Sequence, residues 1–248
     1  MTLPIPLFFG LLGGSALLAG LLKNGFGVGA GAFITPILSL FMPPAAAVAM
    51  MTPILLITDV DGIRLYWKKW DSALSLRLLP SAAVGTVAGL LWSHAISPDL
   101  LKRTIGLLTI LFSLYVIFLK NREANSRLDV WDALPVQIGW GLAAGLIGAL
   151  INAAGIVLTI YFILIKLPKV KYIGTLMLLL TVMDAIKIVY FALVGSIGGS
   201  GWLNVVYVLP LVLLGGYIGH KINLRVSPQK FESILFSLIF VSGVALLL

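Results

Sequence analysis

The sequence contains no cysteine, only two histidines and few charged residues. The missing cysteines exclude disulfide bonds, thiolate metal sites and cysteine nucleophiles. His94 and His220 are far apart in the chain, which disfavours a histidine metal centre, so no metal and no cofactor is predicted. Charged residues make up 10% of the chain, whereas a soluble domain carries about 25%. This composition excludes an ordinary soluble domain.

Most residues of the chain are apolar. They make up 60% of the 248 residues, and the mean hydropathy is +1.10. The apolar runs are roughly 20 residues long, as membrane-spanning helices require, and do not alternate as barrel strands do. The first of them, MTLPIPLFFGLLGGSALLAG, lacks the basic start of a signal peptide and is interpreted as a membrane segment. The sequence predicts an all-α integral protein of the inner or plasma membrane, embedded in the lipid bilayer.

The apolar segments fall into two halves, residues 1–119 and 133–248. Between them lies a polar linker, KNREANSRLDVWD, at residues 120–132. The predicted segments are Pro4–Leu22, Ala32–Met42, Ala45–Trp67, Ala73–Ile96 and Leu100–Leu119, then Ala133–Leu150, Ile156–Ile165, Lys171–Ser196, Trp202–His220 and Phe231–Leu248.

The two halves resemble one another, which indicates an internal duplication. Four matches share a spacing of 130 residues and three share a spacing of 124. The matched positions are Pro80 and Pro210, Gly85 and Gly215, Gly89 and Gly219, Ser97–Pro98 and Ser227–Pro228, Gly31 and Gly155, Pro44 and Pro168, and Tyr66 and Tyr190.

Lysine and arginine positions indicate how the halves are oriented. If the opening segments (Pro4–Met42 and Ala133–Ile165) are single kinked spans, the loop charges divide as eight on one side against seven on the other. If each opening segment is a helix hairpin, one side of the membrane has fourteen Lys and Arg residues, including Lys23, and the other side has only Lys102 and Arg103. Cytoplasmic loops are enriched in Lys and Arg, so the hairpins are favoured. They predict two inverted repeats, each a Gly-broken hairpin followed by three transmembrane helices, with both termini outside and the linker cytoplasmic.

The opening hairpins are broken at short, glycine-containing stretches. Gly25, Gly27, Gly29 and Gly31 occupy alternate positions in the first, and Asn152–Gly155 occupies the corresponding place in the second. A helix that begins inside the membrane directs unpaired N–H groups and a positive dipole end at the gap. We therefore expect Gly25, Gly27, Gly29, Gly31, Asn152 and Gly155 to bind an anionic substrate, with the Asn152 amide as a further donor. Whether the hairpins cross the membrane fully or are re-entrant stays open.

Glycines four residues apart also have a purely structural interpretation, because they let two helices approach closely. We favour this interpretation for the pairs outside the breaks: Gly10 and Gly14, Gly85 and Gly89, Gly141 and Gly145, and Gly215 and Gly219.

Four ionisable residues lie inside predicted spans, where charges are costly and usually functional. They are Asp59, Asp61, Asp184 and Lys187. Lys187 is predicted to bind the anion and the three aspartates to exchange protons. The alternative is that Asp61 with Arg64, and Asp184 with Lys187, neutralise each other one helical turn apart.

Threonine hydroxyls add further candidate donors near these residues. Thr35, Thr52 and Thr181 are predicted to contact substrate. The alternative is that each hydroxyl bonds only to a carbonyl of its own helix.

The breaks and the segment after them resemble a known family. GFGVGAG (Gly25–Gly31) and TPILLITDVDGIRLYWKKWD (Thr52–Asp71) resemble the first repeat of the sulfite exporter TauE/SafE family, and GLAAGLIGALINAAG (Gly141–Gly155) resembles its second. The resemblance implies a permease for small sulfur-containing or organic anions. The sequence departs from the family pattern in two places. The second break, Asn152–Gly155, has fewer glycines than the family usually has. Asp59 and Asp61 stand where Ser or Thr is expected, and these added acids favour proton coupling.

These observations predict a secondary transporter of small anions that works by alternating access with proton coupling. A passive anion channel and a membrane-embedded enzyme are the alternatives. The sequence has no Ser/His/Asp grouping, no Walker sequence and no metal-ligand cluster, which disfavours an enzyme and ATP-driven transport. The net charge of +8 is assigned to cytoplasmic loops and not to nucleic-acid binding.

Overall fold

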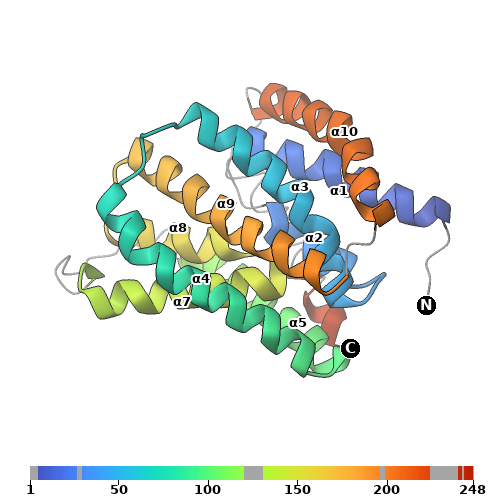
Figure 1. Cartoon of the computed structure of the whole chain (residues 1–248), viewed down its shortest axis with the longest axis horizontal. Coiled ribbons are helices and arrows are strands. Elements are labelled where there is room, and N and C mark those ends of the chain that lie inside the picture. The colour runs from blue at the N-terminus through green and yellow to red at the C-terminus, as the bar shows by residue number, and fades with distance from the viewer. Residues whose placement is uncertain are drawn as a thin grey trace.

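The computed structural model describes residues 5–26, 30–119, 131–195, 199–223, 240–241 and 243–247 (Figure 1). Within this part the chain is helical and contains no strand, which confirms the predicted all-α class. The helices are α1 (Ile5–Phe26), α2 (Ala30–Leu38), α3 (Pro44–Leu65), α4 (Ser72–Ala95), α5 (Pro98–Leu119), α7 (Leu134–Ile151), α8 (Ala154–Leu164), α9 (Lys169–Leu193) and α10 (Gly199–Asn223). Most of the predicted linker and of the segment Phe231–Leu248 lies outside the described residues.

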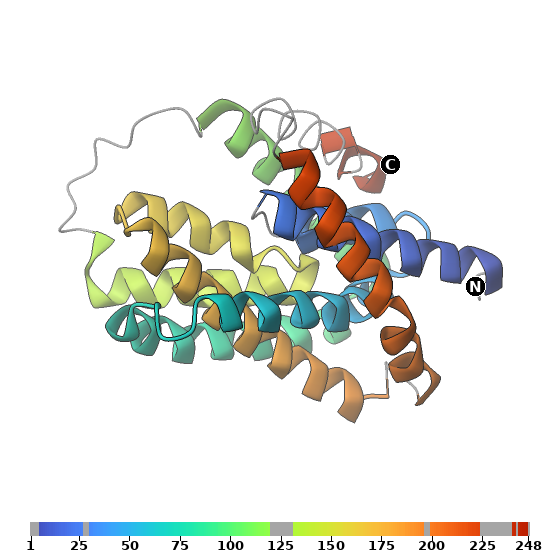
Figure 2. The same cartoon turned by 90° about the horizontal axis from the view of Figure 1, so that it is seen from above.

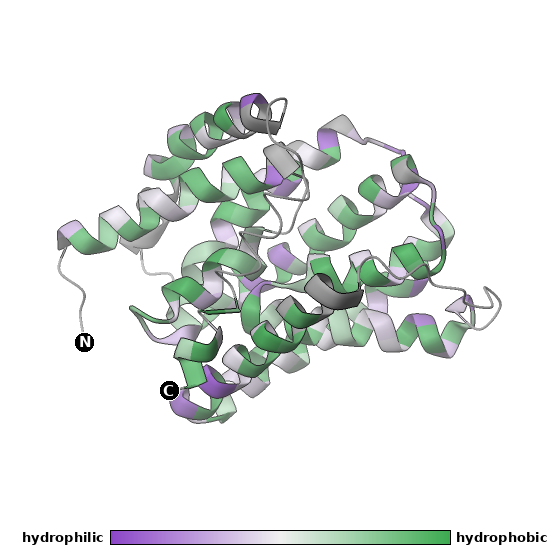
Figure 3. Ribbon diagram, turned by 180° about the vertical axis from the view of Figure 1, so that it is seen from behind, coloured by the Kyte–Doolittle hydropathy of each residue, from purple (hydrophilic) through white to green (hydrophobic). Residues whose placement is uncertain are grey.

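Five of the described helices, α1, α3, α4, α7 and α9, are long and apolar enough to cross a membrane. Apolar residues predominate along the helices (Figure 3). Many large apolar side chains point outwards, including Leu76, Leu193 and Tyr207, which are more than 70% exposed. Such exposure would promote aggregation in water and suits contact with lipid. The chain is therefore a multi-pass membrane protein.

The second arms of both hairpins are too short to cross a bilayer. Helix α2 has 9 residues and α8 has 11, which at about 1.5 Å per residue gives roughly 14 and 17 Å. The hydrocarbon core is about 30 Å thick. Of the two forms that the sequence left open, these lengths favour hairpins that enter the membrane only part of the way.

Helices α3 and α9 run antiparallel through the middle of the molecule (Figure 1). Val48 and Ala49 at the start of α3 pack with Phe191 near the end of α9. At the opposite end, Gly62 of α3 faces Met177 of α9. This central pair joins the first half of the chain to the second.

Two further helix pairs also join the halves: α1 packs with α10, and α4 packs with α7 (Figures 1 and 2). A Cβ atom at Gly85 of α4 would lie 2.3 Å from the Leu142 carbonyl oxygen of α7, and one at Gly215 of α10 would lie 2.0 Å from the Leu17 carbonyl oxygen of α1. Only glycine permits backbones to approach this closely. The matched glycines Gly85 and Gly215 therefore make equivalent contacts in the two pairs.

Close packing is also confirmed at Gly89, Gly141 and Gly145, each of which faces a neighbouring helix. It is wrong for Gly10 and Gly14, because a Cβ atom at either would meet no described atom within 4 Å.

Candidate functional site

The second break is made by a residue in the left-handed conformation. Helix α7 ends at Ile151, and its C-cap Asn152 has a φ of 57° and donates its N–H to the Gly148 carbonyl at 3.0 Å. Asparagine tolerates this conformation better than most residues because its side chain forms local hydrogen bonds. Asn152 thereby reverses the chain, and α8 begins two residues later.

The two breaks meet in space. A Cβ atom at Gly31, in the first turn of α2, would lie 2.5 Å from the Asn152 Cβ and 2.6 Å from its carbonyl oxygen. The Asn152 side-chain amide donates to the Thr35 hydroxyl at 3.1 Å and to the Val48 carbonyl at 3.4 Å. The break of the second half is therefore bonded to α2 and α3 of the first half.

A small buried cavity, here called the central cavity, lies where the breaks meet. Its volume is about 20 Å³, roughly the space that one water molecule needs. It is lined by Lys23, Ala30, Gly31, Leu55, Asp59, Gly148, Asn152, Ala154, Gly155, Leu180, Met183, Asp184 and Lys187. Both short helices direct their first residues to it, and both halves of the chain contribute to its wall.

Lys187 is held on the α7–α9 side of the central cavity. Its ammonium group lies 2.5 Å from an Asp184 oxygen and donates to the Asn152 side-chain oxygen at 2.6 Å and to the Gly148 carbonyl at 3.4 Å. Lys187 is 2% exposed and Asp184 5%. An ammonium group has three protons to donate, and three acceptors surround this one.

Lys23 forms the second ion pair of the cavity, with Asp59. Lys23 lies in the last turn of α1 and is 8% exposed, and Asp59 of α3 is 1% exposed. The expectation that Lys23 belongs to a cytoplasmic loop is therefore wrong, since α1 continues to Phe26 and buries this lysine. Its isolation is the signal that could have found it: no other Lys or Arg precedes Arg64.

Two positive and two negative side chains thus face one buried space. A net charge at this depth would carry a large desolvation penalty, whereas paired charges compensate each other. With all four side chains charged, the positive and negative charges that line the central cavity are equal in number.

None of the remaining predicted site residues is among the described residues that line the central cavity. The Thr52 and Thr181 hydroxyls bond to their own helices, at Val48 and Met177, both at 2.8 Å, and the structure does not bring them to the central cavity. Gly25 belongs to α1, so the first break starts later than predicted. Gly27 and Gly29, and the side chain of Asp61, lie outside the described residues.

A family model described as Sulfite exporter TauE/SafE matches residues 12–246. The chain belongs to this family. The matched range includes both breaks and all four charged side chains of the central cavity. No curated protein and no solved structure matches the chain.

Membership of the TauE/SafE family confirms the resemblance seen in the glycine-containing segments and implies a membrane transporter of anions. The family is one of transporters, which is consistent with the expectation that the chain is not an enzyme. The buried lysines and the two short helices therefore belong to a chain whose family moves anions across membranes.

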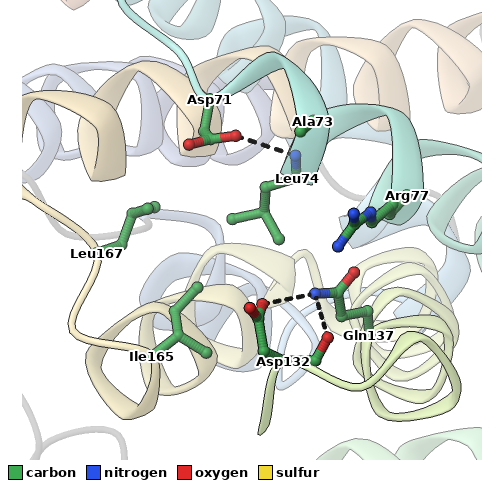
Figure 4. Close-up of a pocket in the computed structure, with 8 residues that line it drawn as sticks. All are labelled: Asp71, Ala73, Leu74, Arg77, Asp132, Gln137, Ile165 and Leu167. Atoms are coloured by element: carbon green, nitrogen blue, oxygen red, sulfur yellow. Dashed lines mark hydrogen bonds between the residues drawn. The ribbon is translucent and has the colours of Figure 1, made fainter. Parts of the chain in front are cut away.

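A second, larger cavity in this TauE/SafE chain lies where the first turns of α4 and α7 meet the α8–α9 connection (Figure 4). Its volume is about 420 Å³. Asp71 caps α4 there by accepting the Leu74 N–H at 3.1 Å, and it also pairs with Lys171 at 3.0 Å. The Leu74 N–H and the Lys171 ammonium hold the pKa of Asp71 below its usual value.

The opposite wall of the larger cavity is formed by Gln137, whose side-chain nitrogen donates to the carbonyl and to a side-chain oxygen of Asp132, at 3.1 and 3.0 Å (Figure 4). None of these residues is a predicted site residue. Asp71 carries a recognisable signal, since an aspartate directly before an apolar run is a typical helix N-cap.

Proposed function

We propose that this TauE/SafE chain is a secondary transporter that binds a small anion in the central cavity and couples its movement to protons. Sulfite, sulfonates and related organosulfur or organic-acid anions are the proposed substrates. The observation that carries the proposal is the meeting of two helix breaks and two buried lysines at one cavity between the halves of the chain.

The chemistry of the cavity wall suits an oxyanion. The first residues of α2 and α8 line it, and helix N-termini attract anions through their N–H groups and their dipoles. Lys187 adds a positive charge next to the Asn152 amide. The oxygens of a sulfite or sulfonate group can accept several such hydrogen bonds at once, and charge-assisted bonds are the strongest kind.

The arrangement of the halves supports alternating access. Contacts along α4 and α7 advance in the same direction, from Gly85 with Leu142 to Gly89 with Leu146, so these helices run parallel. If each short connection reverses the chain, α7 then runs opposite to α1, as two inverted repeats require. Transporters with inverted repeats bind substrate between the repeats and rock one against the other.

The size of the central cavity supports a closed form of such a transporter. At about 20 Å³ it has room for little more than one water molecule. An anion of several heavy atoms enters only when the surrounding elements move. A cavity this small supports a carrier that changes shape over a pore that is always open.

The test is transport by purified protein in liposomes. With an inward proton gradient, we expect labelled sulfite or methanesulfonate to accumulate above its external concentration, and a protonophore to abolish the accumulation. Flux that only equalises the two concentrations supports a passive anion channel instead. Absence of flux for every sulfur oxyanion, sulfonate and carboxylate in a folded sample contradicts the proposal.

A further inference from the structure

We infer that Lys23 is a second anion-binding residue and that Asp59 is the proton acceptor that releases it. The inference rests on the proposed function of the central cavity. It assigns the coupling step to one ion pair, Lys23 with Asp59, whereas Lys187, the first anion-binding residue, stays paired with Asp184 throughout.

The two lysines differ in how firmly they are held. Lys187 has acceptors from Asp184, Asn152 and Gly148, so it stays bonded if one of them is lost. Among the described residues, Lys23 has one hydrogen-bond and ion-pair partner, Asp59, and interacts with Asp184 and Lys187 only through their charges. Protonation of Asp59 therefore removes the negative charge that neutralises Lys23. An incoming anion can take the place of that carboxylate.

The two pairs also differ in what they connect. Asp184 and Lys187 are three residues apart on α9, and their contact holds no two helices together. Lys23 and Asp59 are 36 residues apart, and their contact joins the end of α1 to α3. When Lys23 exchanges Asp59 for the anion, the contact between the end of α1 and α3 is lost. The first hairpin is then held differently beside the first turn of α2, which lines the central cavity.

The charge balance sets the stoichiometry. Among the described residues, Lys23, Lys187, Asp59 and Asp184 are the charged side chains that line the central cavity, and the described lining residues of α2, α7 and α8 carry no charge. Asp61 follows Asp59 by two positions on α3, with its side chain outside the described residues.

A monovalent anion alone would leave the neutral cavity with one uncompensated negative charge, which is costly at this depth. In the proposed step one proton from water forms an O–H bond on the Asp59 carboxylate. The Lys23 ammonium keeps its own protons and bonds to the anion. One proton accompanies each monovalent anion, and the cavity is neutral before and after.

The experiment measures the affinity of purified protein for methanesulfonate, which does not itself titrate between acidic and mildly alkaline pH. For the wild type, we expect the affinity to fall about tenfold for each pH unit on the alkaline side, as the loss of one linked proton requires. Asp59→Asn should bind independently of pH, as tightly as the wild type does at acidic pH. Asp184→Asn should keep the pH dependence.

Variants of Lys23 complete the test. Because Lys23→Gln alone leaves the buried Asp59 carboxylate without a cation, the double variant Lys23→Gln/Asp59→Asn is measured beside it. We expect the double variant to fold, to bind independently of pH and to bind at least about tenfold more weakly than Asp59→Asn, as loss of a charged hydrogen bond predicts. Asp99→Asn, which removes an exposed carboxylate from the first turn of α5, is the control and should match the wild type.

Each part can fail separately. If Asp59→Asn keeps the pH dependence, or if the double variant binds as tightly as Asp59→Asn, the inference is wrong while the proposed function stands. If Asp184→Asn abolishes the pH dependence, the coupling carboxylate is Asp184 and the inference is again wrong. If folded wild-type protein binds neither methanesulfonate nor sulfite at any pH, the proposed function fails, and the inference fails with it.

Discussion

Lys187 shows how a single side chain can serve both stability and binding. Removing its charge leaves Asp184, 5% exposed, without its cation, and breaking one side of a buried ion pair costs about 3–5 kcal/mol. Loss of binding in Lys187→Ala could therefore reflect unfolding. The neutral pair Lys187→Gln/Asp184→Asn separates the two effects.

We expect Lys187→Gln alone to lower the thermal unfolding temperature strongly, and the double variant to recover most of the loss because no buried charge is left unpaired. Both should bind sulfite at least about tenfold more weakly than the wild type, since each lacks a charged donor. Thermal unfolding with and without sulfite measures both properties. A double variant with wild-type affinity would show that Lys187 does not bind the anion.

Asp71, at the larger cavity, makes a prediction about pH. Its pKa is lowered in the folded chain, first by the Leu74 N–H and then by Lys171. The stabilisation is therefore complete above the unfolded value, about 3.9, and is lost as the pH falls through the lower folded value. The exposed partner Lys171 contributes little, because surface ion pairs are worth about 0–1 kcal/mol. Most of the effect belongs to the helix cap.

We expect Asp71→Ala to destabilise the protein by about 1 kcal/mol at neutral pH through loss of the cap. Asp71→Asn, which keeps a capping oxygen, should stay within about 0.5 kcal/mol of the wild type. Thermal unfolding at a series of pH values measures both, and the gap between the wild type and Asp71→Ala should narrow as the carboxylate becomes protonated. Equal losses in the two variants would assign the effect to the ion pair with Lys171.

At the scale of helices, the contact between the two breaks is the feature on which the site depends. It admits no side chain at Gly31, where a Cβ atom would press on the Asn152 backbone. Gly14 of α1 offers a matched control, because a Cβ atom there meets no described atom within 4 Å. Both substitutions add one methyl group to a helix.

Gly31→Ala should destabilise the protein by about 1–3 kcal/mol, as overpacking of a filled core does, and should weaken anion binding by displacing Asn152. Gly14→Ala should leave binding unchanged and raise stability by up to about 1 kcal/mol, since alanine favours helix more than glycine does. Thermal unfolding and sulfite binding report on both. If the two variants behave alike, the breaks do not meet as described.

Apolar runs and glycine or proline breakers are enough to locate the helices in the described part of the chain, because hydropathy and backbone freedom act locally. Partners distant in the chain were not visible in the same way. The rule that places lysines outside the membrane ended the first segment at Leu22, whereas a carboxylate 36 residues away permits Lys23 to be buried. The sequence predicts a break at Asn152, but its bond to Thr35, 117 positions away, cannot be read from one sequence.

At the scale of the whole molecule, each half of the chain packs one helix on the other half: α10 on α1, and α4 on α7. The backbone approaches at the matched glycines Gly85 and Gly215 make the two contacts alike. The charge count agrees with inverted halves even without Lys23, since fourteen minus one leaves thirteen basic residues against Lys102 and Arg103. The direction of the whole assembly in the membrane stays a prediction.

Because the chain has no cysteine, single introduced cysteines can test that direction without further mutation. Ser126→Cys places a thiol in the linker between the halves, and Ser97→Cys places one in the exposed α4–α5 connection on the predicted opposite side. In intact cells, a membrane-impermeant maleimide should label Ser97→Cys and spare Ser126→Cys, and both should react after permeabilisation. The reverse pattern would put the termini in the cytoplasm, and equal labelling of both in intact cells would contradict inverted halves.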